Sequence, residues 1–300
     1  MKKKIFMISV SGKYWEEEKY NKRLSDKIKT ENNLSDIVAR QIVSKNFTDE
    51  ELFALSNDLE LKNPFTKKND FLKGVKLLDN SIKNKEHIFI IGDYDVDGCA
   101  STSLLVKLLK KTEAKYSYYI PNRFLDGYGS SLNLIKKIIK NKPRLIIMLD
   151  NGSSSNEVID FLNERKLIHY YDHHEIYNHI QKSDILINPK KNCDYSEFNY
   201  LCSTSLTYFF IDLYIKKKKL NINFSKNLFL VLMATISDVM PLRKINGIIA
   251  KKVLSKINFE KNYFFNKVFE IKKIKKPVEI IDFGFLFGPI VNSAGRLDDP

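Results

Sequence analysis

The sequence has few cysteines and no long apolar run, and both shortages narrow the kinds of protein that it can encode. Its 300 residues include three cysteines, Cys99, Cys193 and Cys202, and no two of them form a Cys-x-x-Cys pair. An odd count without that spacing argues against a zinc ribbon or a disulfide framework and favours a reducing, cytoplasmic compartment. No apolar stretch reaches the roughly 18 residues of a membrane-spanning helix. The apolar part of the basic N-terminus is also too short for a secretory signal.

Basic residues outnumber acidic ones, 50 against 36, which gives a formal net charge of +14. An excess of positive charge on a chain of this size suits binding to a polyphosphate such as nucleic acid. The same composition, rich in lysine, asparagine and isoleucine, can also arise from a compositional bias of the genome. The lysines at 216–219 and 272–276 are equally consistent with a solvated surface. Charge by itself therefore leaves the partner open.

Three segments with different hydropathy patterns predict the domain organisation. Residues 1–85 are polar and mostly helical, with Ser35 as the N-cap of one helix and another helix starting near Asn69, which predicts an N-terminal helical extension. Between 86 and 245, short apolar runs alternate with helical periods. This alternation predicts an α/β fold with a mainly parallel sheet flanked by helices. Residues 246–300 predict a helical portion that closes this domain and ends in a loop rich in glycine and proline.

The limits of the expected elements follow from the same pattern. The strands are expected at residues 87–92, 115–120, 144–149, 167–171 and 184–188. The helices that alternate with them or follow them are expected at residues 100–111, 131–141, 155–165, 203–217, 225–236 and 247–257.

Acidic residues follow three of these apolar runs at the point where each strand ends. They are Asp93, Asp95 and Asp97 after the first run, Asp150 after the second, and Asp172, with His173 and His174, after the third. Because the carboxyl ends of parallel strands lie at one edge of a sheet, these side chains should converge on one crevice. Carboxylates with one or two imidazoles suit Mn²⁺ or Mg²⁺. Adjacent histidines point apart in an extended segment, so only one would bind a given metal.

Two other interpretations of the first acidic run need weighing. The pattern from Asp93 to Gly98 matches the start of a calcium-binding EF-hand loop, but that loop needs a bidentate glutamate at its twelfth position, which is Leu104 here. An EF-hand loop also follows a helix, whereas an apolar strand precedes these aspartates. A second interpretation is structural, because an aspartate after a strand often caps the next helix, and Asp97 is placed to do so.

Several segments, in order, resemble motifs of the DHH phosphoesterase superfamily and, within it, the bacterial RecJ single-strand exonucleases. The strings GDYDVDG, LDNGSS and YYDHHE are similar to motifs I to III. The other similar segments are VSGKYW, YIPNRFLDGYG, INPKKNCDYSEFNYLCSTSLTYFF, MATISDVMPLRKINGIIAKKVL and FGPIVNSAGRL, the last resembling an NxAGR loop. The resemblance covers essentially the whole chain.

The resemblance implies a nuclease that uses two divalent cations, Mn²⁺ or Mg²⁺, to hydrolyse single-stranded DNA from its 5′ end in DNA repair and recombination. The implied metal ligands are Asp95, Asp97, Asp150, His173 and Asp238, with Asp93 binding the first ion or hydrogen-bonding behind it. Asp150 would bridge the ions, Asp172 would support His173, and His174 would meet the scissile phosphate. Arg123 resembles the residue that reads the 5′ phosphate. Asn292 and Arg296 of the NxAGR segment would contact the nucleic acid, and a single-strand-binding protein or a helicase is the implied protein partner.

The chain departs from the resemblance in two motifs and in length. LDNGSS stands where the family often has a string like VDCGIS, and DGYGSS replaces the usual EGYGPN. Relatives continue into a second, DHHA1-type domain with a Gly-Gly-His motif and then an OB-type domain, and neither follows Pro300. We therefore expect a fragment of a longer protein, or else a shortened chain, that binds metal but holds DNA poorly.

Two rival functions share these features. One is a phosphodiesterase for short oligonucleotides or another small phosphoester, from the same superfamily. The other is a catalytically inactive, DNA-binding replication scaffold. The N-terminal extension and the YIPNR segment favour the exonuclease over the first, and the complete set of acidic and histidine motif positions favours it over the second.

Overall fold

The structure is a computed structural model that describes residues 7–15, 18–126, 130–151, 156–163, 168–171, 185–190, 193–256 and 259–297. The chain divides into two compact units, Met1–Leu59 and Glu60–Pro300. In the described part of the chain, every helix is too short or too polar to span a bilayer.

The smaller unit is a short hairpin followed by three helices. Its elements are the antiparallel strands β1 (Met7–Ile8) and β2 (Tyr14–Trp15), and the helices α1 (Lys22–Glu31), α2 (Asp36–Ser44) and α3 (Asp49–Ser56). Ser35 caps α2 as predicted, because its side chain accepts the backbone N–H of Val38. Ile28, Ala39, Ile42 and Val43 form the small core of this unit.

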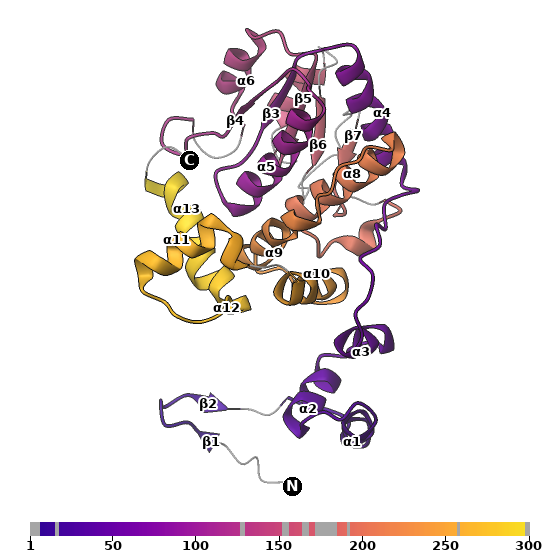
Figure 1. Ribbon diagram of the computed structural model, residues 1–300, viewed down its shortest axis with the longest axis vertical. Helices are drawn as coiled ribbons and strands as arrows, with labels where there is room; N and C mark the ends of the chain where they lie inside the picture. The colour runs from indigo at the N-terminus through magenta and orange to yellow at the C-terminus, as the bar shows by residue number, and fades with distance from the viewer. Residues whose placement is uncertain are drawn as a thin grey trace. The chain divides into compact units, whose positions relative to one another are not determined.

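A five-stranded parallel sheet forms the centre of the larger unit (Figure 1). Its strands are β3 (Ile88–Ile91), β4 (Tyr116–Tyr119), β5 (Leu145–Leu149), β6 (Ile168–Tyr171) and β7 (Ile185–Ile187), and their order is β4-β3-β5-β6-β7. The predicted α/β fold with a mainly parallel sheet is thus confirmed. From β3 the chain goes to one side to form β4 and then returns to the other side to form β5. This reversal takes place at the carboxyl ends of β3 and β5, the position at which such sheets bind ligands.

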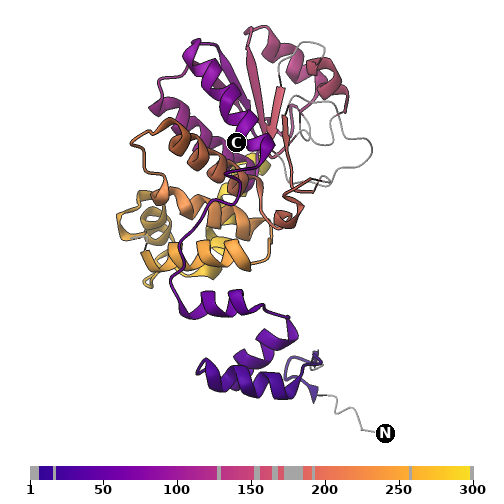
Figure 2. The same cartoon turned by 90° about the vertical axis from the view of Figure 1, so that its right-hand side faces the viewer.

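Helices cover both faces of this sheet (Figure 2). The helices of the larger unit are α4 (Asn69–Lys83), α5 (Val96–Lys111), α6 (Leu132–Ile139), α7 (Asn156–Asn163), α8 (Ser203–Lys218), α9 (Leu228–Ser237), α10 (Lys244–Lys256), α11 (Tyr263–Lys272), α12 (Ile280–Asp282) and α13 (Gly288–Leu297). Ile88 and Ile90 of β3 pack in a core with α4, α5, α8 and α9, whereas Phe89 and Ile91 pack with α6 and α7. Both faces of β3 are therefore buried, as its continuous apolar run predicts.

The segment from 280 to 297 is helical, although its glycines and proline predict a loop. A π-helical stretch, Phe283–Phe287, joins α12 to α13. Pro289 stands two residues after the π-helical stretch, where the regular helical hydrogen-bond ladder is already interrupted, so a residue without an N–H is accommodated there. Gly295 serves packing and not a turn, because a Cβ there would lie 2.8 Å from the backbone oxygen of Tyr94.

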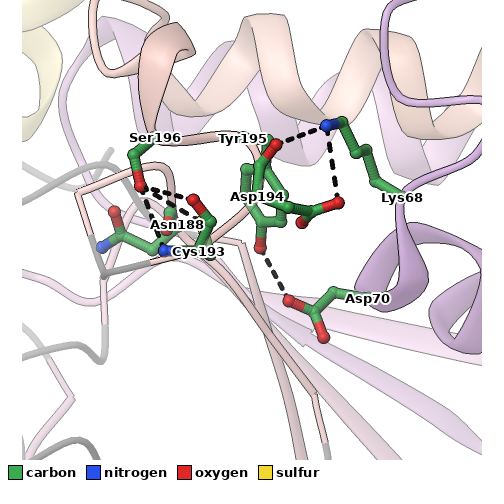
Figure 3. A network of polar contacts seen from close by, with 7 residues as sticks. All are labelled: Lys68, Asp70, Asn188, Cys193, Asp194, Tyr195 and Ser196. Atoms are coloured by element: carbon green, nitrogen blue, oxygen red, sulfur yellow. Dashed lines mark hydrogen bonds and ion pairs between the residues drawn. The ribbon is translucent and has the colours of Figure 1, made fainter.

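The segment after β7 is held against the start of α4 by a polar network (Figure 3). The hydroxyl of Tyr195 donates to Asp70 Oδ2 at 2.8 Å. Lys68 Nζ donates to the backbone oxygen of Asp194 and lies 3.4 Å from its carboxylate. These contacts explain why α4 packs with the larger unit, although the sequence grouped it with residues 1–85. The predicted limits at 85 and 245 stay predictions.

Buried tyrosines on α8 should make the fold less stable in alkali. Burial and, to a smaller extent, the charges of Asp212 and Asp79 respectively raise the pKa of Tyr208 and of Tyr214 to about 12. Above the ordinary tyrosine value near pH 10, the unfolded chain releases protons that the folded chain retains. The contribution of these tyrosines to the free energy of unfolding is therefore fully present below about pH 10. Between about pH 10 and pH 12 it falls by up to about 1.4 kcal/mol per pH unit for each tyrosine.

Urea unfolding at a series of pH values from 9 upward measures this effect. The variant Tyr208→Phe should lose stability less steeply above about pH 10 than the wild type, because it lacks one of the titrating groups. Equal slopes for the two proteins would contradict the role assigned to this tyrosine.

Candidate metal centre

Three carboxylates converge at the carboxyl ends of β3 and β5. Asp93, Asp95 and Asp150 each offer a ligand oxygen, and these oxygens all lie within 4.8 Å of one another. Asp93 and Asp150 are 2% and 1% exposed, and Asp95 is half-buried. Carboxylates held this closely repel one another unless a cation lies between them. Oxygen donors at this spacing, mostly buried, fit a hard divalent cation such as Mn²⁺ or Mg²⁺.

The first turn of α5 positions two of these carboxylates. Asp95 is the N-cap of α5, and its Oδ1 accepts the N–H of Gly98 at 2.9 Å. Asp93 Oδ1 accepts the N–H of Tyr94 at 2.8 Å. A Cβ on Gly98 would lie 2.5 Å from both the backbone nitrogen and the backbone oxygen of Asp93. The glycine of this motif therefore lets the strand end lie directly against the helix.

Asp97 does not join this group of three. Its carboxylate is fully buried and accepts the backbone N–H groups of Ser203 and Thr204, both at 2.7 Å. It thereby caps the N-terminus of α8, where a negative charge is stabilised by the unpaired N–H groups of the helix. The structural role that the sequence suggested for Asp97, capping the next helix, belongs instead to Asp95. The helix it does cap begins more than a hundred residues later, so no local pattern could reveal the contact.

Asp150 adopts a left-handed backbone conformation at the end of β5. Its φ is 62°. Such values are uncommon outside glycine, although aspartate and asparagine tolerate them best, and they cluster at functional sites. Its buried carboxylate lies beside those of Asp93 and Asp95.

Asp238 ends α9 as its C-cap and is half-buried. It is not part of the three-carboxylate group among the described residues. The next residue, Val239, has a φ of 55° and a side chain 88% exposed. A β-branched residue in this conformation is a true outlier.

Replacing Val239 by glycine should raise the free energy of unfolding by about 1 kcal/mol, because glycine adopts positive φ without the steric cost of a Cβ. Val239 closes α9 by donating its N–H to Ile236 O at 3.0 Å, a role that glycine fills most often at helix ends. Thermal unfolding measures the gain. Val239→Ala is the matched control and should show only part of the gain, because alanine lacks the β-branch but keeps the Cβ. Equal stability of both variants would contradict this account of Val239.

Residues from two distant segments lie next to motif I. The guanidinium of Arg123 lies over the ring of Tyr94, 5.7 Å from its centre. Asn292 Oδ1 accepts the N–H of Val96 at 2.9 Å and so helps to cap α5. Arg296, one turn further along α13, is exposed. The structure thus places all three residues with an expected nucleic-acid contact near the carboxylates, and that contact itself remains a prediction.

Tyr94 is a central residue that the sequence did not single out, although it stands within motif I. Its ring is 7% exposed. Burial and the charges of Asp93 and Asp95 raise the pKa of its hydroxyl, while Arg123 and Arg296 oppose the shift. The phenol therefore stays protonated at neutral pH, among charges of both signs. The neighbouring thiol of Cys99 also stays protonated at neutral pH, because burial and the same two aspartates raise its pKa to about 12.

Asp172, His173 and His174 lie outside the described residues. The strand before them, β6, pairs in parallel with β5, and its last residue, Tyr171, lies opposite Leu149, which directly precedes Asp150. The roles expected of Asp172, His173 and His174 stay predictions.

Comparison with known proteins identifies the family. The sequence profile of the DHH family, N-terminal domain, matches residues 87–236, half of the chain. The chain belongs to the DHH family. This stretch contains the sheet, the three-carboxylate group and most of α9, so the family assignment covers the candidate site.

Individual relatives of this DHH protein are RecJ proteins. It is 31% identical to the single-stranded-DNA-specific exonuclease RecJ of Haemophilus influenzae and 29% identical to that of Escherichia coli, in each case over 76% of this chain and 42% of the relative. RecJ of Thermus thermophilus in complex with Mn²⁺ has the same fold, with a TM-score of 0.74 at 19% identity, over 92% of this chain and 39% of that chain. The molecule is thus a RecJ-like DHH phosphoesterase domain. It spans about two fifths of the length of the curated relatives.

Proposed function

We propose that this DHH protein is a metal-dependent exonuclease that hydrolyses single-stranded DNA from the 5′ end, in DNA repair and recombination. The observation that carries the proposal is the group of Asp93, Asp95 and Asp150 at the carboxyl ends of β3 and β5, whose ligand oxygens lie within 4.8 Å of one another. The choice of single-stranded DNA as the substrate rests on the similarity to RecJ proteins. A cytoplasmic location, and a single-strand-binding protein or a helicase as partner, belong to the same proposal.

Asp93, Asp95 and Asp150 would hold the two divalent cations, Mn²⁺ or Mg²⁺, with Asp150 shared by both ions. His173 and Asp238 would complete the set of metal ligands. The carboxylate of Asp97 already accepts the N–H groups of Ser203 and Thr204, so it would bind a metal only through its remaining oxygen lone pairs. When bound, such cations activate a water molecule and neutralise the charge that builds up on the phosphate.

The remaining roles in the proposal concern the DNA strand. Arg123, already oriented over Tyr94, would bind the terminal 5′ phosphate, and Arg296 and Asn292 would hold the backbone. His174 would contact the scissile phosphate and add positive charge in the transition state, while Asp172 would orient His173. Because phosphate contacts dominate such binding, affinity should fall steeply with salt.

A comparison of substrates tests the proposal. With Mn²⁺, a 5′-phosphorylated single strand should be degraded faster than the same strand with a 5′ hydroxyl, a dinucleotide or pyrophosphate. Arg123→Gln should remove the preference for the 5′ phosphate, and Arg144→Gln, an exposed arginine at the opposite end of β5, is the matched control. Faster hydrolysis of the dinucleotide would assign the protein to small phosphoesters, and DNA binding without hydrolysis would make it a scaffold.

A further inference from the structure

The side chain of Asn151 joins the ends of the two strands that lead into the candidate metal ligands. It is 6% exposed, and its Nδ2 donates to the carbonyl oxygen of Leu149 at 2.8 Å and to that of Ile91 at 3.2 Å. Leu149 ends β5 directly before Asp150, and Ile91 ends β3 two residues before Asp93. One amide group therefore bridges the ends of β3 and β5, next to the residues that carry the carboxylates.

The oxygen of the same amide reaches a third segment. Asn151 Oδ1 accepts a hydrogen bond from the hydroxyl of Ser130 at 2.8 Å, and Ser130 is 5% exposed. Ser130 directly precedes Ser131, the N-cap of α6, and it ends the connection from β4 that carries Arg123. The three hydrogen bonds of Asn151 thus link the end of β3, the end of β5 and the start of α6, which Arg123 precedes in the same connection.

The contact between Asn151 and Ser130 joins two buried polar side chains from different segments of the chain. A buried polar group is favourable only when its partners are present, so each residue makes the other acceptable in the core.

We propose that Asn151 is a positioning residue that sets the separation between the Asp93 and Asp150 carboxylates, and that Ser130 couples the Arg123 segment to it. The proposal deepens the proposed function, because it concerns the same site. It requires that metal affinity and the binding of the 5′ end respond to one buried amide.

Mn²⁺ affinity, measured by calorimetry on the folded protein, tests the proposal separately from nuclease activity. Asn151→Ala should weaken Mn²⁺ binding by about 10- to 100-fold, the usual effect of losing a group that orients metal ligands. Asn63→Ala is the matched control. The amide of Asn63 also donates twice, to Phe209 O and Asp212 Oδ2, and accepts once, from the N–H of Phe65, but it lies outside the site.

The control should lower the unfolding temperature and leave Mn²⁺ affinity unchanged. An unchanged affinity in Asn151→Ala, or an equal loss in both variants, would overturn the proposal and leave Asn151 a purely structural residue. If wild-type protein binds Mn²⁺ but cleaves no DNA, the exonuclease assignment fails while this comparison still stands.

Ser130→Ala tests the coupling, and this variant can be measured even if Asn151→Ala does not fold. It should raise KM for a 5′-phosphorylated strand several-fold with kcat nearly unchanged, because it loosens the Arg123 segment and keeps both bonds of Asn151 Nδ2. Combined with Asn151→Ala it should add no further loss of Mn²⁺ affinity, since residues in contact act together. A KM equal to that of the wild type, or fully additive losses, would contradict the coupling.

Discussion

Asp150→Asn should abolish metal-dependent hydrolysis, with a loss of about 10³-fold or more, because Asp150 is the carboxylate proposed to lie between the ions. Asparagine keeps the shape of the side chain and tolerates the left-handed backbone at this position, where φ is 62°. The loss would therefore report the missing charge and not a disturbed fold. A rate close to that of the wild type would rule out the proposed mechanism.

The same substitution should make the metal-free protein more stable. It removes one of three carboxylates whose oxygens lie within 4.8 Å of one another, and relief of such a strained site commonly adds about 1 kcal/mol. Saturating Mn²⁺ should reverse the order, because only the wild type gains stability from binding. Asp79→Asn is the control. Asp79 pairs with Lys83 and Lys218 on α4 and α8, and its loss should leave the stabilisation by Mn²⁺ unchanged.

Gly98→Ala should damage stability and metal binding together. The added Cβ would lie 2.5 Å from the backbone of Asp93, a distance that atoms do not tolerate and that no side-chain rotation can relieve. The strand end must move, and the Asp93 carboxylate with it. We expect a loss of about 3 kcal/mol in the free energy of unfolding, at the upper end for overpacking, and a loss of Mn²⁺ affinity of about 10-fold or more.

Gly284→Ala provides the comparison for this variant. A Cβ on Gly284 would meet only a methyl group of Ile236, at 3.1 Å, and that side chain can yield. Its stability should change by less than about 1 kcal/mol, and its Mn²⁺ affinity should equal that of the wild type. Denaturant unfolding and a Mn²⁺ titration of both variants decide the matter. Unchanged metal affinity in Gly98→Ala would show that the close approach does not position Asp93.

Much of the fold could be predicted because the strongest signals are local. β3 and β5 are short apolar runs without polar alternation, and such runs indicate strands covered on both faces. Parallel order follows from the helices between them, and it places Asp93 and Asp150 at one edge. The convergence of these two carboxylates could therefore be predicted from the topology of the sheet alone.

The contacts that could not be predicted join residues far apart in sequence. The local sequence around Asp97 predicts that this residue caps the helix that follows it. Its carboxylate instead binds the first turn of α8. Gly295 and its neighbours read as a loop because glycine and proline are usually found in turns. Here the glycine allows α13 to lie against Tyr94, a requirement visible only once both segments are in place.

Asn151 illustrates the same limit at the site itself. As one residue of a motif string it shows no chemistry of its own, and its role depends on three partners: Ile91, Leu149 and Ser130. Ser130, whose hydroxyl donates to the amide oxygen and so fixes the orientation of the amide, belongs to a different segment. Residues that orient metal ligands are in general less visible in a sequence than the ligands, because hydrogen-bond geometry defines them and not residue type alone.

The most direct measurement of the central claim is an anomalous-scattering map from crystals soaked with Mn²⁺. The account predicts manganese at the carboxyl ends of β3 and β5, with oxygens of Asp93, Asp95 and Asp150 each within about 2.5 Å of an ion. Soaked crystals of Asp150→Asn should lose that signal. Manganese bound elsewhere on the molecule, with none at these three carboxylates, would contradict the account.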